Sequence, residues 1–193
     1  KKNSVLKQFN KYLKLNEKAI LNANKKDLLN AQSKKIRDSA IDRLKLSSKK
    51  ILQIRNSINK IIKFKDPVGK ILSSWKRPNG IIIKKRSIPI GVIGAIYESR
   101  PNVTSDVSAL CFKSGNVVIL RGGSEAFYSN KILFKFFKKA LKKKNCDENC
   151  VQLIEYKDKA HVDYLLSNMK KYIDLIIPRG GKRLVKKVLK KST

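Results

Sequence analysis

The stretch that decides the fold reads Ile88-Pro-Ile-Gly-Val-Ile-Gly-Ala-Ile-Tyr-Glu-Ser-Arg-Pro-Asn102. Its apolar part, residues 90–97, stops abruptly at charged and turn-forming residues, and a second apolar run, 117–120, stops at Arg121-Gly-Gly-Ser124. Each run is typical of a buried parallel strand whose carboxyl end opens into a polar loop followed by a helix. In open α/β sheets ligands bind at such carboxyl ends, so this stretch predicts both a fold and the place of a site.

Strand and helix patterns alternate around this stretch. We expect strands over 90–97, 116–121, 151–156 and 172–177, and helices over about 103–114, 124–144, 159–170 and 181–191. Elements of these lengths in alternation imply a parallel sheet with helices on both faces. The sequence therefore predicts a doubly wound α/β domain with a mostly parallel sheet.

The part before this domain has a different pattern. Apolar residues keep helical spacing over residues 1 to about 62, which predicts an N-terminal helical layer within 1–65. Asn24 and Ser47-Ser48 are interpreted as breaks or caps of these helices. Asn79-Gly80 predicts a hairpin within 70–86, and the α/β core follows over 88–193.

The net charge of +32 suggests nucleic acid as a partner, but the composition weakens that interpretation. Only nine of the 46 basic residues are Arg, and lysines occur in every segment rather than in one stripe. We favour a solvated lysine surface, with a basic nucleic-acid-binding α/β module as the alternative. No run is long and apolar enough to cross a bilayer, and we expect no membrane partner and a cytoplasmic location.

The three cysteines, Cys111, Cys146 and Cys150, give an odd count without a disulfide framework, which favours a reducing cytoplasm. A zinc site would need two ligands beyond the Cys146–Cys150 pair, and the sequence has a single histidine, His161. We therefore expect no metal site. Cys111 lies in an apolar helical segment and is interpreted as a core residue.

Polar groups and glycines follow three of the predicted strands, at one edge of the sheet. They are Glu98-Ser99-Arg100-Pro101-Asn102, Arg121-Gly122-Gly123-Ser124-Glu125 and Pro178-Arg179-Gly180-Gly181-Lys182. A Gly pair before a helix lets backbone N–H groups approach a phosphate, although paired glycines can also form plain tight turns. Two such loops, each with a cation, favour a nucleotide site. No Gly-x-Gly-x-x-Gly and no Walker lysine motif is present, which excludes a standard Rossmann or P-loop fingerprint.

Asn102 has two interpretations that the residues alone leave open. Its side-chain amide could donate a hydrogen bond to a developing oxyanion. It could equally cap the helix that is expected to begin near Val103.

Three long blocks carry a resemblance to a known family. Pro89–Thr104, Gly115–Ala126 and Asp174–Gly181 closely resemble the gamma-glutamyl phosphate reductase family (glutamate-5-semialdehyde dehydrogenase) within the aldehyde dehydrogenase superfamily. Weaker matches at Ile20–Asn24 and Asp66–Gly69 extend the resemblance over essentially the whole chain. It implies an aldehyde-dehydrogenase-like, Rossmann-related fold.

The resemblance also implies a reaction, the NADPH-dependent reduction of L-glutamyl 5-phosphate to L-glutamate 5-semialdehyde and phosphate in proline biosynthesis. In that family a cysteine thiolate attacks the acyl phosphate, and the resulting thioester accepts a hydride. Substrate-binding roles fall to Arg100 and Asn102, with Asn102 as the oxyanion donor. Cofactor-binding roles fall to Tyr97, Glu98, Ser99, Arg121, Gly122, Gly123, Ser124, Glu125, Arg179, Gly180 and Gly181.

The family's nucleophilic cysteine belongs to a later catalytic domain, and none of the three cysteines stands in a matching context. We therefore expect residues 1–193 to be an N-terminal NADP-binding domain, without the catalytic domain and inactive alone. The expected partner is a small-molecule substrate, with no specific nucleic acid; a full-length enzyme could be a homo-oligomer. A third interpretation is a non-enzymatic scaffold whose glycine loops are empty.

Overall fold

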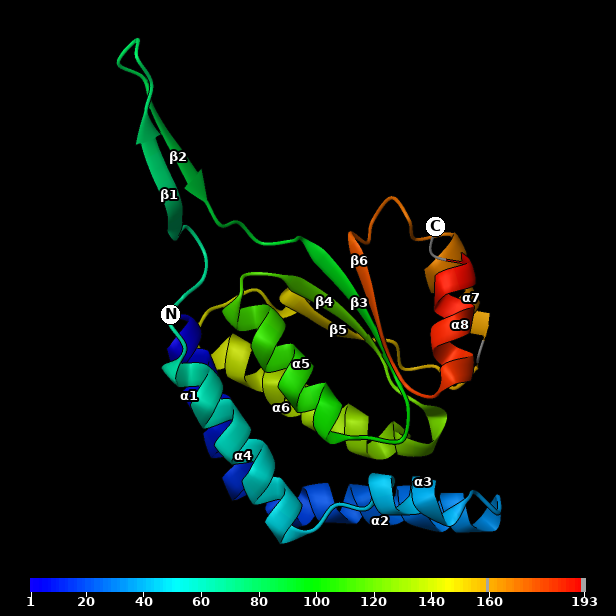
Figure 1. The fold of residues 1–193 in the computed structure, drawn as a ribbon. Coiled ribbons are helices and arrows are strands. Elements are labelled where there is room, and N and C mark those ends of the chain that lie inside the picture. The colour runs from blue at the N-terminus through cyan, green and yellow to red at the C-terminus, as the bar shows by residue number, and fades with distance from the viewer. Residues whose placement is uncertain (159, 192–193) are drawn as a thin grey trace.

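The structure is a computed structural model that describes residues 1–158 and 160–191. A parallel sheet lies between helices on both of its faces, further helices form a layer at the N-terminal end of the chain, and a hairpin projects away from the body (Figure 1). The expected α/β architecture with an N-terminal helical layer is therefore present.

The sheet has the strand order β5-β4-β3-β6, and all its strands are parallel. Its members are β3 (Val92–Tyr97), β4 (Val117–Arg121), β5 (Val151–Leu153) and β6 (Leu175–Arg179). In the register of the sheet, Ile96 of β3 lies opposite Arg121 of β4 and Pro178 of β6. The carboxyl ends of these three strands are therefore neighbours at one edge.

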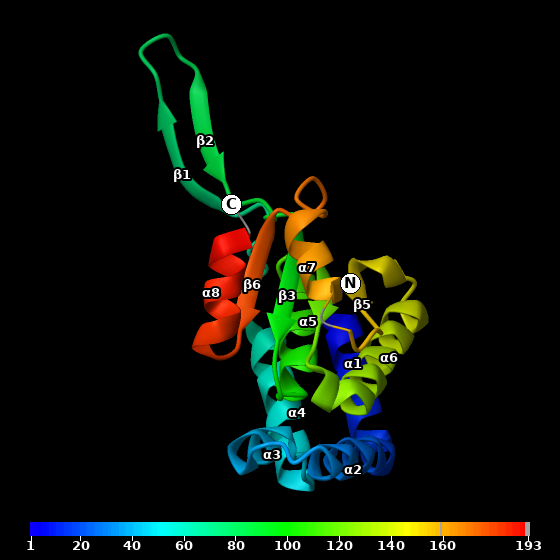
Figure 2. The same ribbon diagram turned by 90° about the vertical axis from the view of Figure 1, so that its right-hand side faces the viewer.

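Successive side chains of β3 alternate between two cores, as the two-residue period of a strand requires. Ile93 and Ala95 pack in the larger core with α5 (Asn102–Lys113) and α6 (Phe127–Lys143). Ile96 packs in the smaller core with α7 (Ala160–Ser167) and α8 (Lys182–Lys191) on the other face (Figure 2). The predicted doubly wound arrangement is confirmed.

Four helices form the N-terminal layer: α1 (Lys2–Leu15), α2 (Glu17–Ser33), α3 (Asp38–Leu44) and α4 (Ser48–Lys63). The helices α1, α2 and α4 pack on α5 or α6, whereas α3 packs on α2. The rings of Phe9 and Phe137 meet edge to face, 4.8 Å between centroids, where α1 contacts α6. The Ser47 hydroxyl caps α4 by accepting a hydrogen bond from the Lys50 N–H, as expected.

Asn24 does not break a helix, so that prediction is wrong. It lies inside α2 with its side chain buried, and its amide donates to the Leu44 carbonyl and to Ser129 Oγ. Its side-chain oxygen accepts from the Leu46 N–H at 2.8 Å. A buried amide with all these partners fixes α2 against α6 and against the segment after α3, which outweighs the weak helix propensity of Asn.

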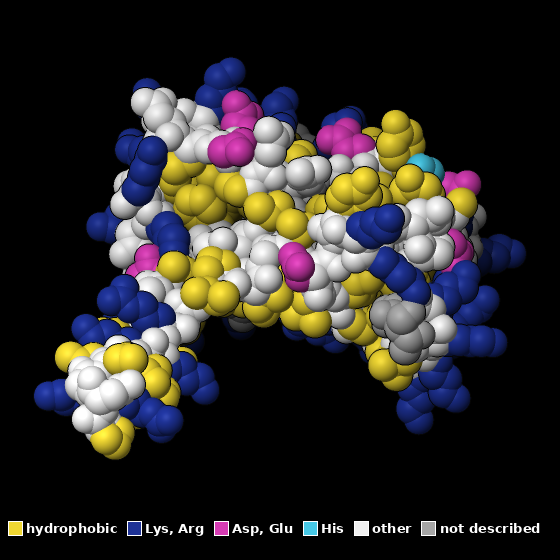
Figure 3. Space-filling model, turned by 90° about the horizontal axis from the view of Figure 1, so that it is seen from above, with side chains coloured by type: hydrophobic (Ala, Val, Ile, Leu, Met, Phe, Trp, Pro, Cys, Tyr) yellow, Lys and Arg dark blue, Asp and Glu magenta, His cyan; other side chains and the backbone are white. Residues whose placement is uncertain are grey.

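The hairpin consists of β1 (Ile71–Lys76) and β2 (Ile82–Arg86), paired antiparallel, with both strands exposed along their whole length. Gly80 at the turn has φ +89°, a conformation that favours glycine. Seen from above, the projecting hairpin carries apolar as well as Lys and Arg side chains, and other basic side chains surround the body (Figure 3). This distribution fits a solvated lysine surface better than a single basic stripe.

Several predicted boundaries shift. The last strand occupies Leu175–Arg179 rather than 172–177, because the chain turns before it: the Tyr172 N–H donates to the Met169 carbonyl. β5 is shorter than expected, a 3-10 turn at Ser124–Ala126 precedes α6, and α7 ends at Ser167. The expected start of that helix at 159 falls outside the described residues. None of the described helices is long and apolar enough to cross a membrane.

Candidate functional site

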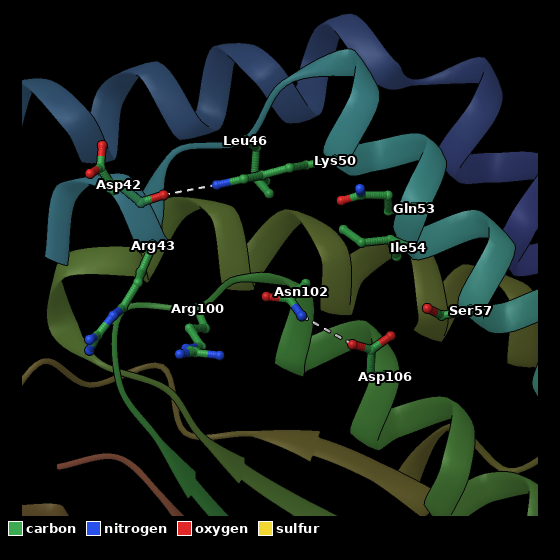
Figure 4. Close-up of a pocket in the computed structure, with 10 residues that line it drawn as sticks. All are labelled: Asp42, Arg43, Leu46, Lys50, Gln53, Ile54, Ser57, Arg100, Asn102 and Asp106. Carbon is green, nitrogen blue, oxygen red and sulfur yellow. Dashed lines mark hydrogen bonds between the residues drawn. The ribbon is translucent and has the colours of Figure 1, made fainter. Parts of the chain in front are cut away.

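Two cavities of about 470 Å³ each are lined in part by residues of the loop 98–102 that follows β3. We call the first the sheet-edge cavity, because it opens at the carboxyl ends of the strands. Its walls are Ile36, Ile96, Tyr97, Glu98, Ser99, Arg121, Gly123, Ser124, Glu125, Val162, Arg183, Leu184 and Lys187. We call the second the helix-layer cavity, lined by Asp42, Arg43, Leu46, Lys50, Gln53, Ile54, Ser57, Arg100, Asn102 and Asp106 (Figure 4).

The sheet-edge cavity collects most of the residues expected to bind a cofactor. Those that line it are Tyr97, Glu98, Ser99, Arg121, Gly123, Ser124 and Glu125. Gly122, Arg179, Gly180 and Gly181 do not line it but are next to it, since Arg179 pairs with Tyr97 across the sheet. The glycine turns of adjacent strands therefore meet at one edge.

Glu125 ties two of these loops together. Its Oε1 accepts hydrogen bonds from both the N–H and the hydroxyl of Ser99, each at 2.6 Å. Ser99 has φ +29°, a value uncommon for a residue with a side chain. The carboxylate thus stabilises an unusual backbone at the end of β3.

Glu98 performs a comparable role at the third loop. Its Oε2 accepts a hydrogen bond of 2.9 Å from the Gly181 N–H, immediately before α8. A negative group is favoured there by the helix dipole and the free N–H groups. The place where sequence predicts a phosphate is therefore held by the chain's own carboxylate.

Three of the four glycines are required by close packing rather than by backbone angle. A Cβ on Gly122 would collide with Nδ2 of Asn130, one on Gly123 would collide with the Glu125 carboxylate, and one on Gly180 would lie 2.6 Å from Oε2 of Glu98. A Cβ on Gly181 would have only an ordinary contact, at 3.9 Å. Gly122 and Gly180 thus let side chains of neighbouring elements reach the sheet edge.

Arg121 is a structural cation. Its side chain is buried, and its guanidinium donates to the carbonyls of Lys157 and Asp158 at 3.3 and 3.0 Å and to that of Gly122. Burial lowers its pKa, against the opposing effect of the Glu125 carboxylate. Arg121 therefore positions the segment after β5, and the exposed Arg183 is the more accessible charge for a ligand in this cavity.

Tyr97 is also a buried residue with a structural hydrogen bond. Its buried hydroxyl lies 2.7 Å from Thr104 Oγ1, and burial raises its pKa. Thr104 in turn donates to Asn130 Oδ1 at 2.8 Å. This buried series of hydrogen bonds joins β3, α5 and α6 beneath the cavity.

The helix-layer cavity contains both residues expected to bind substrate, Arg100 and Asn102. Asn102 is the first residue of α5, after the N-cap Pro101, and makes no capping hydrogen bond, so the capping interpretation is wrong. Its Nδ2 instead donates to Asp106 Oδ2 at 3.1 Å (Figure 4). The amide is thus held at the cavity wall by a carboxylate one turn along the helix.

Several residues of the helix-layer cavity were not predicted as site residues from the sequence. Asp106 follows Asn102 by four residues on an expected helix, and this spacing alone indicates that the two side chains are in contact. Arg43 carries no such signal, because α3 reaches the cavity only through the packing of the helical layer.

The cysteines lie away from both cavities. Cys146 and Cys150 precede β5, at the opposite edge of the sheet from the strand ends, and Cys111 is near the end of α5. Burial raises the pKa of the Cys111 and Cys150 thiols to about 11, which disfavours the reactive thiolate. In the described ranges no three His, Cys, Asp or Glu side chains are grouped as a metal would need.

No family model matches the sequence. Over its whole length, however, the chain is 44% identical to the gamma-glutamyl phosphate reductase of Clostridium tetani, of which it covers 45%. The crystal structure of gamma-glutamyl phosphate reductase from Thermotoga maritima matches it with a TM-score of 0.95 at 40% identity, over the whole chain and 46% of that protein. The chain therefore spans less than half the length of these relatives and corresponds to their N-terminal portion.

More distant structures share the fold alone. A probable aldehyde dehydrogenase from Listeria monocytogenes has a TM-score of 0.72 at 14% identity, over the whole chain and 39% of that protein. An engineered glycolyl-CoA reductase solved with bound NADP+ has a TM-score of 0.68 at 16% identity, over the whole chain and 40% of that protein. The predicted resemblance and the aldehyde-dehydrogenase-like fold are confirmed.

Proposed function

We propose that the chain is the cofactor-binding part of an oxidoreductase that reduces L-glutamyl 5-phosphate with NADPH to L-glutamate 5-semialdehyde and phosphate, in cytoplasmic proline biosynthesis. The observation that carries the proposal is that the ends of β3 and β4 line the sheet-edge cavity, with the end of β6 beside that of β3. The names of the relatives support the reduction of gamma-glutamyl phosphate, and their shared fold supports this edge of the sheet as the cofactor site.

The residues of the sheet-edge cavity suit a dinucleotide. Val162 and Leu184 offer apolar surface for a base, Ser124 and Glu125 offer hydrogen bonds to ribose hydroxyls, and Arg183 offers charge to a phosphate. When bound, NADPH supplies a hydride. Because Glu98 holds the Gly181 N–H, we expect a phosphate at this helix start to displace that carboxylate.

The helix-layer cavity is the proposed substrate side. There Asn102 would donate its amide to the oxyanion that develops on the acyl carbon, and Arg100 would contact an acidic group of the substrate. The loop 98–102 contributes residues to both cavities, so residues of one loop would contact both reactants.

We propose that the nucleophilic cysteine lies outside these residues, since Cys111, Cys146 and Cys150 line neither cavity. In this proposal residues 1–193 form an N-terminal NADP-binding domain, with a helical segment 1–65, a hairpin-like segment 70–86 and a core 88–193. The chain alone should show no reductase activity.

A titration with NADPH and with duplex DNA, at low and high salt, tests the proposal. We expect saturable NADPH binding and only weak DNA binding that salt abolishes. DNA binding that persists in salt, without any NADPH binding, would favour the nucleic-acid-binding module, which none of the reported relatives supports. Saturable NADPH binding would also argue against a scaffold with empty loops.

A further inference from the structure

We propose that Asp106 in the helix-layer cavity binds the ammonium group of the substrate, while Arg43 and Arg100 bind its acidic groups. The ligand class is an α-amino acid with a second acidic group on its side chain. The inference rests on the proposed function, which it extends by naming the residues that would recognise the amino-acid part.

The two arginines are available for a ligand. Neither the Arg43 nor the Arg100 side chain makes a hydrogen bond or ion pair within the described ranges, and both are exposed at the cavity. Lys50 differs, because its ammonium donates to the carbonyls of Asp42 and Lys45 at 2.8 and 2.7 Å. Lys50 therefore holds the turn between α3 and α4, and the two guanidinium groups remain to bind carboxylate or phosphate.

Asp106 has unused hydrogen-bonding capacity. Its Oδ2 accepts from Asn102, but its Oδ1 is buried and has no partner among the residues that the structure describes. An ionised carboxylate can accept about four hydrogen bonds, and an ammonium group offers three donors. An amino group in this cavity would supply both the missing donor and the opposite charge.

The cavity presents groups of both charge signs, as an α-amino acid with a second acidic group requires. In Figure 4 the Arg43 and Arg100 side chains lie toward one end of the cavity, and Asp106 lies toward the other, beyond Asn102. Leu46 and Ile54 contribute apolar wall for methylene groups. A dicarboxylate without an ammonium group would leave Asp106 unpaired beside added negative charge.

The competing explanation is that Asp106 only orients the Asn102 amide. In that case the cavity would bind an acidic ligand equally well with or without an amino group. Tighter binding of ligands that carry an amino group would therefore indicate that Asp106 binds the ammonium group. Equal binding would indicate that Asp106 only orients Asn102.

The experiment is calorimetric titration of the 193-residue chain with L-glutamate, glutarate and N-acetyl-L-glutamate. We expect L-glutamate to bind about tenfold more tightly than either of the ligands that lack a free ammonium group. These ligand comparisons use the unaltered protein and need no variant to fold. Equal affinities, or no saturable binding of L-glutamate, would overturn the proposal.

Two matched variants assign the preference to a residue. Asp106→Asn should abolish the preference for L-glutamate, whereas Asp42→Asn, at another carboxylate of the same cavity, should retain it. Arg43→Ala should weaken binding of both L-glutamate and glutarate. A preference that survives Asp106→Asn, or that disappears in Asp42→Asn, would refute the assignment.

NADPH titration of the same protein separates this inference from the proposed function. NADPH binding without an ammonium preference would refute only the inference. Absence of NADPH binding would refute the proposed function, whatever the amino-acid ligands do.

Discussion

The two cavities have the same volume and share one loop, yet they are built in different ways. The sheet-edge cavity is formed at strand ends, where carboxylates bind backbone N–H groups and glycines admit neighbouring side chains. The helix-layer cavity is formed by charged side chains from α3, α4, α5 and the loop between β3 and α5. The first depends on backbone register, whereas the second depends on how separate helices are packed. A substitution that disturbs one cavity should therefore leave ligand binding in the other cavity unchanged.

The largest expected effect is on the sheet-edge cavity, from Gly122→Val. The new side chain would collide with Asn130 and approach the Tyr97 ring, and overpacking of this kind costs about 3 kcal/mol of unfolding free energy. We expect a lower denaturation midpoint and no NADPH binding. Gly181→Ala is the matched control, since its Cβ has only an ordinary contact. Equal stability of the two variants would contradict the packing role of Gly122.

Arg121→Ala should come next. It removes a buried guanidinium and leaves the carbonyls of Lys157 and Asp158 without their donor, at a cost of about 2–3 kcal/mol. Arg121→Lys should rescue little, because an ammonium cannot reproduce the planar set of donors. Denaturant unfolding measures the free energy of unfolding, and NADPH titration measures the affinity of the sheet-edge cavity for the cofactor. Wild-type stability with reduced NADPH affinity would instead indicate a direct ligand contact.

Asn24→Ala tests the independence of the helix layer. It removes the hydrogen bonds to Leu44, Leu46 and Ser129, with an expected loss of about 2 kcal/mol. Because Leu46 lines the helix-layer cavity, L-glutamate binding should weaken while NADPH binding is retained. Asn30→Ala, at an exposed position of the same helix, is the control. A loss of NADPH binding alone would show that the cavities are not built as described.

The smallest expected effect is a pH-dependent gain in stability from Asp106→Asn. Burial raises the pKa of Asp106 above the usual 3.8, against the lowering effects of Asn102 and Arg179. With a raised pKa in the folded state, the contribution of the carboxyl to stability is complete below 3.8 and is lost as pH rises through the folded-state value. The melting temperature of the variant relative to wild type should therefore increase with pH above 3.8. A difference that is constant with pH would contradict this.

The sheet and the edge where its strand ends meet could be predicted because they depend on local patterns. Apolar runs that stop at Glu98 and at Arg121 locate strand ends, and alternation of strands with helices makes those ends parallel neighbours. The resemblance of the blocks around them to a known family pointed to the same edge. The shift of β6 shows the limit, since Tyr172 belongs by composition to a strand but lies in a turn.

Local sequence patterns did not predict which partners each polar group has in the folded chain. Arg121 appears as a free cation in the sequence, but the carbonyls that it binds come from residues 157 and 158. The Gly181 N–H appears free for a phosphate, but Glu98 reaches it across the β3–β6 pair. Arg43 enters its cavity only after the helices pack. These facts arise from contacts between distant parts of the chain.

The most direct measurement is simultaneous titration of the two cavities. The chain is saturated with NADPH and then titrated with L-glutamate, and the order is then reversed. Two cavities that have no lining residue in common predict one molecule of each ligand per chain, bound together. Failure of NADPH to bind saturably, or mutual exclusion of the two ligands, would contradict the assignment of a cofactor to the sheet edge and a substrate to the helix layer.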